Sequence, residues 1–227
     1  MANNNQNEKP TGIETLNDSL TGIEQKVEKN QKAIMWACLG AAAVVVLILI
    51  YIFAIRKPGI ENANNAIGQA DIESIMGSDS TALVQYQAVA DEYGYEAGNR
   101  AALNSAIILY KQGKYQDALN YLSKYSSKEN VIGATAKALE GDCNVNLDQL
   151  DQALDCFEQA VKISDNNPSL TPYFLMKEAN VYHAQKNYAK EAEVYETITE
   201  KYADFGPRMN IDFQKYLERA NALAGEK

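Results

Sequence analysis

The sequence predicts an all-α protein with a single apolar helix near the N-terminus, followed by a helical solenoid of about four helix pairs and a C-terminal capping helix. Two observations lead to this prediction. The 23 residues from Ala33 to Ile55 carry no charged side chain. After them, small and large apolar residues recur at helical spacing with a period of 35 to 38 residues, which is typical of a chain built from repeated helical units.

The uncharged segment is long enough to cross a membrane. As a helix, with a rise of about 1.5 Å per residue, it reaches roughly 34 Å, and the hydrocarbon core of a bilayer is about 30 Å thick. A cleaved signal peptide would have a short basic start and a small-x-small cleavage site. Here residues 1–32 contain five acidic residues and four lysines, and the apolar run ends in Arg56-Lys57-Pro58-Gly59. We therefore expect a retained single-pass anchor.

The charges beside this segment indicate its orientation. Lys26, Lys29 and Lys32 precede it, and Arg56 and Lys57 follow it. Because Lys and Arg near a span favour the cytoplasmic side, the three preceding lysines predict a cytoplasmic N-terminus and an exported C-terminal part.

The tail before the segment contains a heptad pattern. Apolar residues stand at positions 13, 16, 20, 23 and 27, which is the 3-4 spacing of a coiled coil. This pattern predicts self-association or docking on a partner helix. An amphipathic helix that lies on the inner leaflet, or that continues into the span, fits the same spacing.

The part after the span is acidic. Residues 58–227 contain 15 Lys and Arg against 25 Asp and Glu, so binding to nucleic acid, which depends on cationic contacts to phosphate, is not expected. Docking on an anionic leaflet is disfavoured for the same reason. Cys143 and Cys156 stand 13 residues apart without a C-x-x-C motif, which predicts buried thiols and no metal site. A disulfide between them stays open if the domain is exported.

Three segments of the acidic part share one pattern. Lys111–Leu119, Asn146–Leu154 and Ala184–Ala192 each contain a short polar turn, then an aromatic residue or leucine, then a small residue at the start of an amphipathic helix. Together with the region around Ala82, these segments predict four helix pairs. The chain then divides into a cytoplasmic tail, a span, a juxtamembrane linker, the repeats and a capping helix, at residues 1–32, 33–55, 56–61, 62–207 and 208–227.

The pattern resembles the tetratricopeptide repeat, a helix-turn-helix unit of 34 residues, over roughly residues 62–204. The resemblance implies small residues where two helix backbones approach closely and a large residue that fills the next groove. The small residues are Ala70, Ala106, Gly141 and Ala179 in the first helices and Ala82, Ala118 and Ala153 in the second helices, and the large ones are Tyr86, Leu122, Phe157 and Tyr195. In the fourth unit Glu191 replaces the usual alanine, which predicts a rotated or looser helix pair.

The order of tail, span and small repeat domain resembles a bacterial family that includes the ancillary subunit of the SecYEG translocon. Segments Glu28–Lys32 and Leu170–Lys177 are similar to the same group. The resemblance implies an inner-membrane protein whose repeats face the periplasm, where they contact translocating chains, periplasmic chaperones or the translocon.

The sequence contains no recognisable catalytic or cofactor motif. No phosphate-binding loop, dinucleotide fingerprint, zinc-protease motif or calcium loop is present. The single histidine, His183, has no adjacent serine, cysteine or paired carboxylate for nucleophilic catalysis. We therefore expect a protein that is not an enzyme and binds no cofactor or metal ion.

Recognition of other proteins is the expected function. In the family that the chain resembles, the first helices line a concave peptide-binding surface, whose mixture of aromatic, amide and cationic groups suits an extended peptide. The predicted groove residues are Arg100, Leu103, Ile107, Tyr110, Lys111, Asn146, Tyr173, Met176, Asn180 and His183. A wider inward set adds Asn64, Ile67, Asp71, Asp142 and Val145.

The leading hypothesis is a membrane-anchored interaction module that binds protein partners on the periplasmic side and assists secretion or envelope assembly. An alternative is an oligomeric scaffold for cell-envelope or division machinery, assembled through the heptad tail and the span. A third hypothesis places the repeats in the cytoplasm as a receptor for chaperones.

Overall fold

The computed structural model describes residues 30–127 and 129–225. The chain divides into two units, Met1–Pro58 and Gly59–Lys227, and each is treated by itself. All regular structure in the described residues is helical, as predicted. The heptad pattern at positions 13 to 27 lies outside the described residues, so the predicted tail helix stays a prediction.

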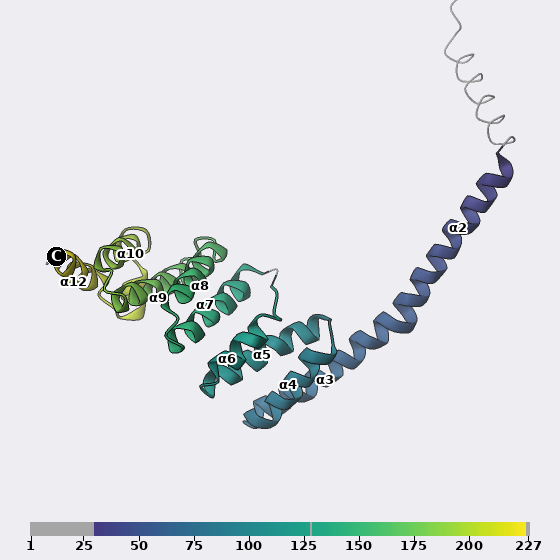
Figure 1. Ribbon diagram of the computed structural model, residues 1–227, viewed down its shortest axis with the longest axis horizontal. Helices are drawn as coiled ribbons and strands as arrows, with labels where there is room; N and C mark the ends of the chain where they lie inside the picture. Colours follow the sequence, from purple (N-terminus) through teal and green to yellow (C-terminus); the bar gives the residue numbers. More distant parts are fainter. Residues whose placement is uncertain (1–29, 128, 226–227) are drawn as a thin grey trace, which may run out of the picture. The chain divides into compact units, whose positions relative to one another are not determined.

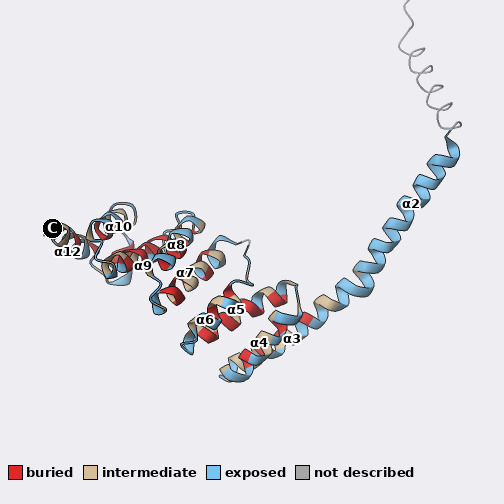
Figure 2. Ribbon diagram, in the orientation of Figure 1, coloured by how far each residue is buried: buried red, intermediate tan, exposed pale blue. Residues whose placement is uncertain are grey.

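The first unit contains the apolar helix. Helix α2 spans Gln31–Ile50, and a wider π-helical turn, η1, follows at Tyr51–Arg56. All residues of α2 are exposed (Figure 2), although they are almost entirely apolar. In the part of the chain that the structure describes, the helical stretch Gln31–Ile75 is the one helix long and apolar enough to cross a membrane.

The second unit is built from helix pairs that follow one another along the chain (Figure 1). The predicted four pairs and the C-terminal helix are confirmed. Residues 56–61, expected to link the span to the repeats, are helical, because α3 begins at Lys57. The pairs are α3 (Lys57–Ile75) with α4 (Asp79–Glu92), α5 (Glu96–Lys111) with α6 (Tyr115–Leu122), α7 (Asn130–Asn146) with α8 (Leu150–Ile163), and α9 (Leu170–Ala184) with α10 (Tyr188–Lys201). The short α11 (Phe205–Met209) and α12 (Phe213–Gly225) complete the unit.

The turn inside each helix pair has the same backbone geometry. Gly77, Gly113, Asp148 and Lys186 have φ values of 81°, 74°, 59° and 58°, and each stands five residues before the small position of its second helix. The residue after each turn donates its backbone N–H to a carbonyl five residues earlier, as Lys114 does to Leu109 at 2.9 Å. The left-handed residue lets this hydrogen bond satisfy a carbonyl at the end of the first helix. The turn geometry therefore recurs along the chain with the same period as the core positions.

The predicted small positions lie where helices pack closely. Ala70, Ala106 and Ala179 in the first helices, and Ala82 among those of the second, are fully buried. Gly141 shows why size matters, because a Cβ built there lies 2.5 Å from Cε1 of Phe157. The large positions, Tyr86, Leu122, Phe157 and Tyr195, are also buried. The small and large positions that the repeat pattern predicted therefore belong to the core of the unit.

Ala118→Leu and Ala153→Leu are each expected to lower the free energy of unfolding by about 1–3 kcal/mol, because the added atoms overpack a close helix crossing. Both alanines have no exposed surface. Urea unfolding followed by circular dichroism measures the effect. Ala189→Leu, at an exposed site of α10, is the control. Equal stability of all three variants would contradict the packing described here.

The expectation of a looser fourth pair at Glu191 is wrong. The Glu191 side chain is fully buried, and its two oxygens have different partners. Arg219 of α12 donates from Nη2 to Oε1 at 2.7 Å, and Nδ1 of His183 lies 2.8 Å from Oε2. A carboxylate at the position usually taken by alanine is compensated by these two groups, and it joins α9, α10 and α12.

The two cysteines of the repeat unit are buried free thiols on α7 and α8. Burial, with the nearby charges of Asp142 and Glu140, raises the pKa of Cys143 to about 12, and burial also raises the pKa of Cys156. Since the thiolate is the reactive form, both should resist iodoacetamide at pH 8 in the folded chain and react after urea unfolding. Intact-mass measurement checks this, and rapid labelling of either cysteine without urea would contradict it.

Candidate functional site

A cavity of about 230 Å³ opens between the first helices of the second, third and fourth pairs. It is the described cavity whose position coincides with the predicted groove. Its walls are largely apolar, and one lysine and one aspartate stand among them. The lining residues are Leu103 and Ile107 of α5, Ile132, Thr135, Ala136, Ala138, Leu139 and Asp142 of α7, and Tyr173, Phe174 and Lys177 of α9.

Lys177 and Asp142 form an ion pair in the cavity wall. The lysine Nζ donates to Oδ1 at 2.7 Å and to Oδ2 at 3.0 Å, and the two side chains are only 19% and 23% exposed. Nζ also lies 5.1 Å from the ring centroid of Tyr173 and 5.8 Å from that of Phe157. Burial lowers the pKa of Lys177, but the hydrogen bond and charge of Asp142 and the contact with Tyr173 outweigh it, so the net pKa is raised. The lysine is therefore held charged and in one position.

Tyr110 and Asn146 extend this polar group along the same face. Burial raises the pKa of the Tyr110 hydroxyl, the charge of Asp142 adds to the rise, and Lys177 and a hydrogen bond with Asn146 oppose it. The Asn146 amide also donates to the Asp142 carbonyl at 2.8 Å. A neutral hydroxyl and an amide thus stand beside the ion pair, where they can exchange hydrogen bonds with a peptide backbone.

Five of the ten predicted groove residues gather at this place. Leu103, Ile107 and Tyr173 line the cavity, and Tyr110 and Asn146 lie beside Asp142. Their roles in binding stay predictions.

Other predicted groove residues lie outside the cavity lining. Arg100 donates to Asp71 at 2.7 Å, and the same carboxylate accepts a hydrogen bond from Tyr86, so Arg100 joins the first two helix pairs. Lys111 and Asn180 are exposed, and Met176 packs partly buried against the C-terminal core cluster.

The wider inward set is also divided. Ile67 belongs to the buried core and Asp71 to the Arg100 network. Asn64 and Val145 are exposed, and of this set only Asp142 lines the cavity.

Lys177 is the functional candidate that the sequence pattern missed. The pattern selected Met176, one residue earlier in α9, and one residue turns a helix face by about 100°. The spacing of four residues from Tyr173 to Lys177, which places two side chains on one face, was the available signal. The cavity residues of α7, such as Ile132 and Leu139, carried no distinguishing signal because they resemble ordinary core positions.

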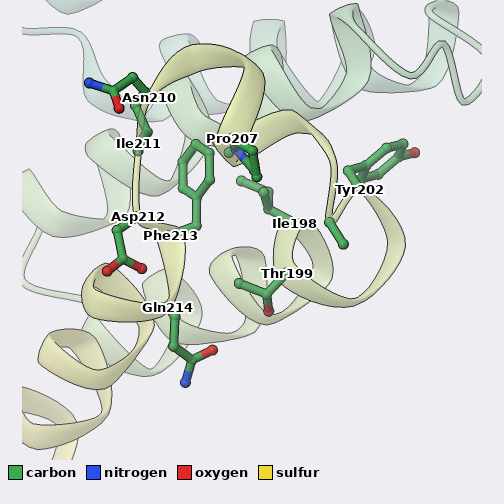
Figure 3. Close-up of a pocket in the computed structure, with 11 residues that line it drawn as sticks. Ile198, Thr199, Tyr202, Pro207, Asn210, Ile211, Asp212, Phe213 and Gln214 are labelled. Atoms are coloured by element: carbon green, nitrogen blue, oxygen red, sulfur yellow. The ribbon is translucent and has the colours of Figure 1, made fainter.

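A second cavity, of about 480 Å³, lies at the C-terminal end of the unit. Figure 3 shows Ile198 of α10 with Pro207 and Phe213, around a space bordered by the loop between α11 and α12. Thr199, Asp212 and Gln214 add polar groups to its lining. None of the predicted groove residues reaches it, so we do not assign the groove to this cavity.

Glu178 is a buried carboxyl group of α9, the helix that also carries Tyr173 and Lys177 of the first cavity. Its side chain is 8% exposed, and burial, together with the charge of Glu158, raises its pKa from 4.5 to about 7, against the opposing charge of Lys190. The folded state therefore binds a proton that the unfolded state has lost between these two pH values.

The stability of the unit should consequently fall as the pH rises from 4.5 to 7. The contribution of Glu178 is fully present below pH 4.5 and is lost as the pH passes the folded-state pKa of about 7. This difference corresponds to about 3 kcal/mol at most. Glu178→Gln should flatten the dependence of unfolding free energy on pH over this range, and Glu196→Gln, an exposed site on α10, should not. Equal slopes in wild type and Glu178→Gln would contradict the assignment.

Comparison with known proteins agrees with this arrangement of helix pairs. The tetratricopeptide repeat family model matches residues 103–168 and 140–204. No curated protein matches the chain by sequence. Solved structures that are similar include MamA, at 20% identity over 73% of this chain and 89% of that one, with a TM-score of 0.52.

Two further similar structures cover more of this chain. The pilF protein of Pseudomonas aeruginosa shares 16% identity over 81% of this chain and 76% of its own, with a TM-score of 0.51. A tetratricopeptide repeat protein of Parabacteroides merdae shares 15% identity over 89% and 77%, with a TM-score of 0.51. At these identities the likeness concerns the fold. Residues 103–204 of the helical unit therefore match the tetratricopeptide repeat by sequence, and the similar structures show the same fold over a larger part of the chain.

Proposed function

We propose that this chain is a membrane-anchored module that binds an extended segment of a partner protein on the face formed by α5, α7 and α9. Tetratricopeptide repeats indicate a protein–protein interaction module. The observation that carries the proposal is the apolar cavity on this face, with the Lys177–Asp142 ion pair in its wall. An apolar side chain of the partner fills the cavity.

The exposed apolar surface around the cavity supports this proposal. Tyr173 is 36% exposed and Ile132 is 42% exposed, and both line the cavity beside the buried Phe174. Covering apolar surface contributes about 25 cal/mol per Å². Tyr110 and Asn146 then supply hydrogen-bonding groups for the backbone on either side of the anchoring residue.

The apolar helix gives the proposed location. We infer that it anchors the chain in a bacterial inner membrane, with the N-terminus in the cytoplasm and the repeats in the periplasm. There the module assists protein secretion or envelope assembly by binding translocating chains, periplasmic chaperones or the translocon. The length of the helix supports the anchor, and the three lysines before it, against Arg56 and Lys57 after it, support the orientation.

Site-specific photo-crosslinking in intact cells tests the binding face. Benzoylphenylalanine at Tyr173 should crosslink to partner proteins, which mass spectrometry then identifies. The same group at Gln152, an exposed position of α8, is the control for the opposite helix of a pair. Crosslinks that are equal at both positions, or absent at Tyr173, would overturn the proposed site.

Filling the cavity gives a second test. Thr135→Trp should block the cavity and reduce crosslinking from Tyr173. Thr197→Trp is a matched control, because each threonine donates its hydroxyl to the carbonyl four residues earlier, at 2.8 Å for Thr135 and 3.0 Å for Thr197, and Thr197 lies outside the cavity lining. Retained crosslinking in Thr135→Trp would show that the cavity does not hold the partner.

The orientation is tested with alkaline phosphatase fused after Lys227, since this enzyme folds to an active form outside the cytoplasm. Activity is the expected result, and an inactive but intact fusion would place the repeats in the cytoplasm. The size of the protein after mild detergent extraction distinguishes the scaffold hypothesis from the interaction module. A scaffold should be an oligomer that dissociates when residues 11–30 are deleted.

A further inference from the structure

The buried Glu191 carboxylate organises a second polar cluster, which joins α9, α10 and α12. Its side chain is fully buried, whereas its two partners, His183 and Arg219, are 43% and 44% exposed. A buried carboxylate thus holds two half-exposed groups at the surface. Arg219 comes from α12, outside the repeat helices that line the proposed groove.

The guanidinium of Arg219 is fixed on two sides. Nη2 donates to Glu191 at 2.7 Å, and the guanidinium carbon lies 5.1 Å from the ring centroid of Tyr216. Five N–H donors are available to an arginine, and one described hydrogen bond uses one of them. The remaining donors keep the planar fork that binds a carboxylate in a bidentate manner.

His183 is fixed in a similar way. Nδ1 points to Glu191 at 2.8 Å, and the ring lies 5.7 Å from that of Tyr188 in a tilted arrangement. With Nδ1–H directed at the carboxylate, Nε2 is the nitrogen of the half-exposed ring that remains available to other partners. Glu191 therefore orients two neighbouring polar groups before any ligand arrives.

His183 shares a face of α9 with Tyr173, which lines the cavity. Tyr173, Met176, Asn180 and His183 follow helical spacing along one face of α9, and the ten steps from Tyr173 to His183 span about 15 Å of helix. An extended peptide covers that distance in about four or five residues. One bound segment can therefore reach both the apolar cavity and the Arg219–His183 pair.

We propose that the free N–H donors of Arg219, which Glu191 orients, bind a carboxylate of the partner segment whose apolar side chain fills the cavity between α5, α7 and α9. The proposal rests on the proposed function and adds a second contact to it. The carboxylate belongs either to an acidic side chain or to the C-terminus of the segment, and its distance from the anchoring residue is about five residues.

Synthetic peptides test this with the full chain in detergent micelles. The first probe is acetyl-Ser-Leu-Ser-Gly-Ser-Ser-Glu-Ser-amide, which carries a leucine and a glutamate five positions apart. A second probe replaces the glutamate with glutamine, and a third moves the glutamate to two positions from the leucine. A fourth ends at the same place in a free carboxylate, acetyl-Ser-Leu-Ser-Gly-Ser-Ser-Ala.

Binding is measured by NMR titration, with the Arg219 Nε–H resonance reporting the carboxylate and the Ile107 and Ile132 methyl groups reporting the cavity. The first probe should bind about fivefold more tightly than the glutamine and short-spacing probes. The first and fourth probes distinguish a side-chain carboxylate from a chain terminus. The probe that carries the preferred carboxylate should shift the Arg219 resonance at a lower peptide concentration.

Arg219→Lys is the variant of choice, because it keeps a positive charge beside Glu191 and removes the fork. It should abolish the difference between the glutamate and glutamine probes, whereas Arg208→Lys, near the C-terminal end of α11, should retain it. Methyl shifts with both probes but no carboxylate preference would overturn this inference and leave the cavity proposal standing. The absence of methyl shifts with every probe would overturn the cavity proposal itself.

Discussion

Arg219→Met is expected to lower the free energy of unfolding by about 4 kcal/mol, because it removes one of the two described partners of a fully buried carboxylate. Glu191 has no exposed side-chain surface, and the Nη2–Oε1 distance is 2.7 Å. The loss should be concentrated at the C-terminal end of the unit, where α12 packs on α10. Urea unfolding of the full chain in mild detergent gives the free energy, and hydrogen exchange of α12 gives the location.

A double variant separates the ion pair from simple packing. Glu191→Met combined with Arg219→Met removes both charges together, so it should recover most of the stability lost in Arg219→Met. Arg208→Met is the control, because Arg208 is exposed and its short contact, at 2.7 Å, is to the uncharged Pro168 carbonyl. If Arg219→Met unfolds as readily as Arg208→Met, the buried pair does not hold α12 in place.

Gly98→Ala is expected to destabilise the unit by at least about 3 kcal/mol, which is the upper range for overpacking a close contact. A Cβ built at Gly98 lies 1.7 Å from the carbonyl oxygen of Tyr93 and 2.8 Å from its carbon. Both are backbone atoms at the junction between α4 and α5, so no side-chain rotation relieves the clash. The chain between the first two helix pairs must move instead.

Gly68→Ala is the matched control for this variant. Gly68 also lies within a helix of the first pairs, but a Cβ there meets no heavy atom within 4 Å. The substitution should therefore stabilise the helix by up to about 1 kcal/mol through alanine's higher helix propensity. In thermal unfolding measured in parallel, the unfolding temperature should fall for Gly98→Ala and rise for Gly68→Ala, relative to wild type. A Gly98→Ala variant as stable as wild type would refute the close approach at Tyr93.

Much of the fold could be predicted from the sequence because the repeat is defined by spacings between residues that are close in the chain. The distance of five residues from turn to small residue recurs in the first three pairs, as from Gly113 to Ala118 and from Asp148 to Ala153. Such positions need only helical periodicity and a turn to be recognised. The fourth turn shows the limit, since Lys186 adopts the left-handed conformation without being glycine.

The candidate site was less accessible, because its central contact joins distant residues. Lys177 and Asp142 are 35 positions apart, and whether they meet depends on how α7 and α9 stack. The sequence placed Asp142 on the inward face and selected Met176 in place of Lys177. Neighbouring residues of a helix point in different directions, so a shift of one position selects a side chain in the core and misses the one in the cavity wall.

The sequence by itself determined the apolar helix, the four helix pairs and the core residues, because length, hydropathy and a period of about 36 residues are properties of the chain read in order. Only the tertiary structure decided where the Glu191 carboxylate lies and which side chains pair with it. Read in the repeat pattern, it was a defect at an alanine position. In the folded unit Arg219 and His183 reach it from α12 and α9, and a buried charge is stable only where such partners are brought to it by packing.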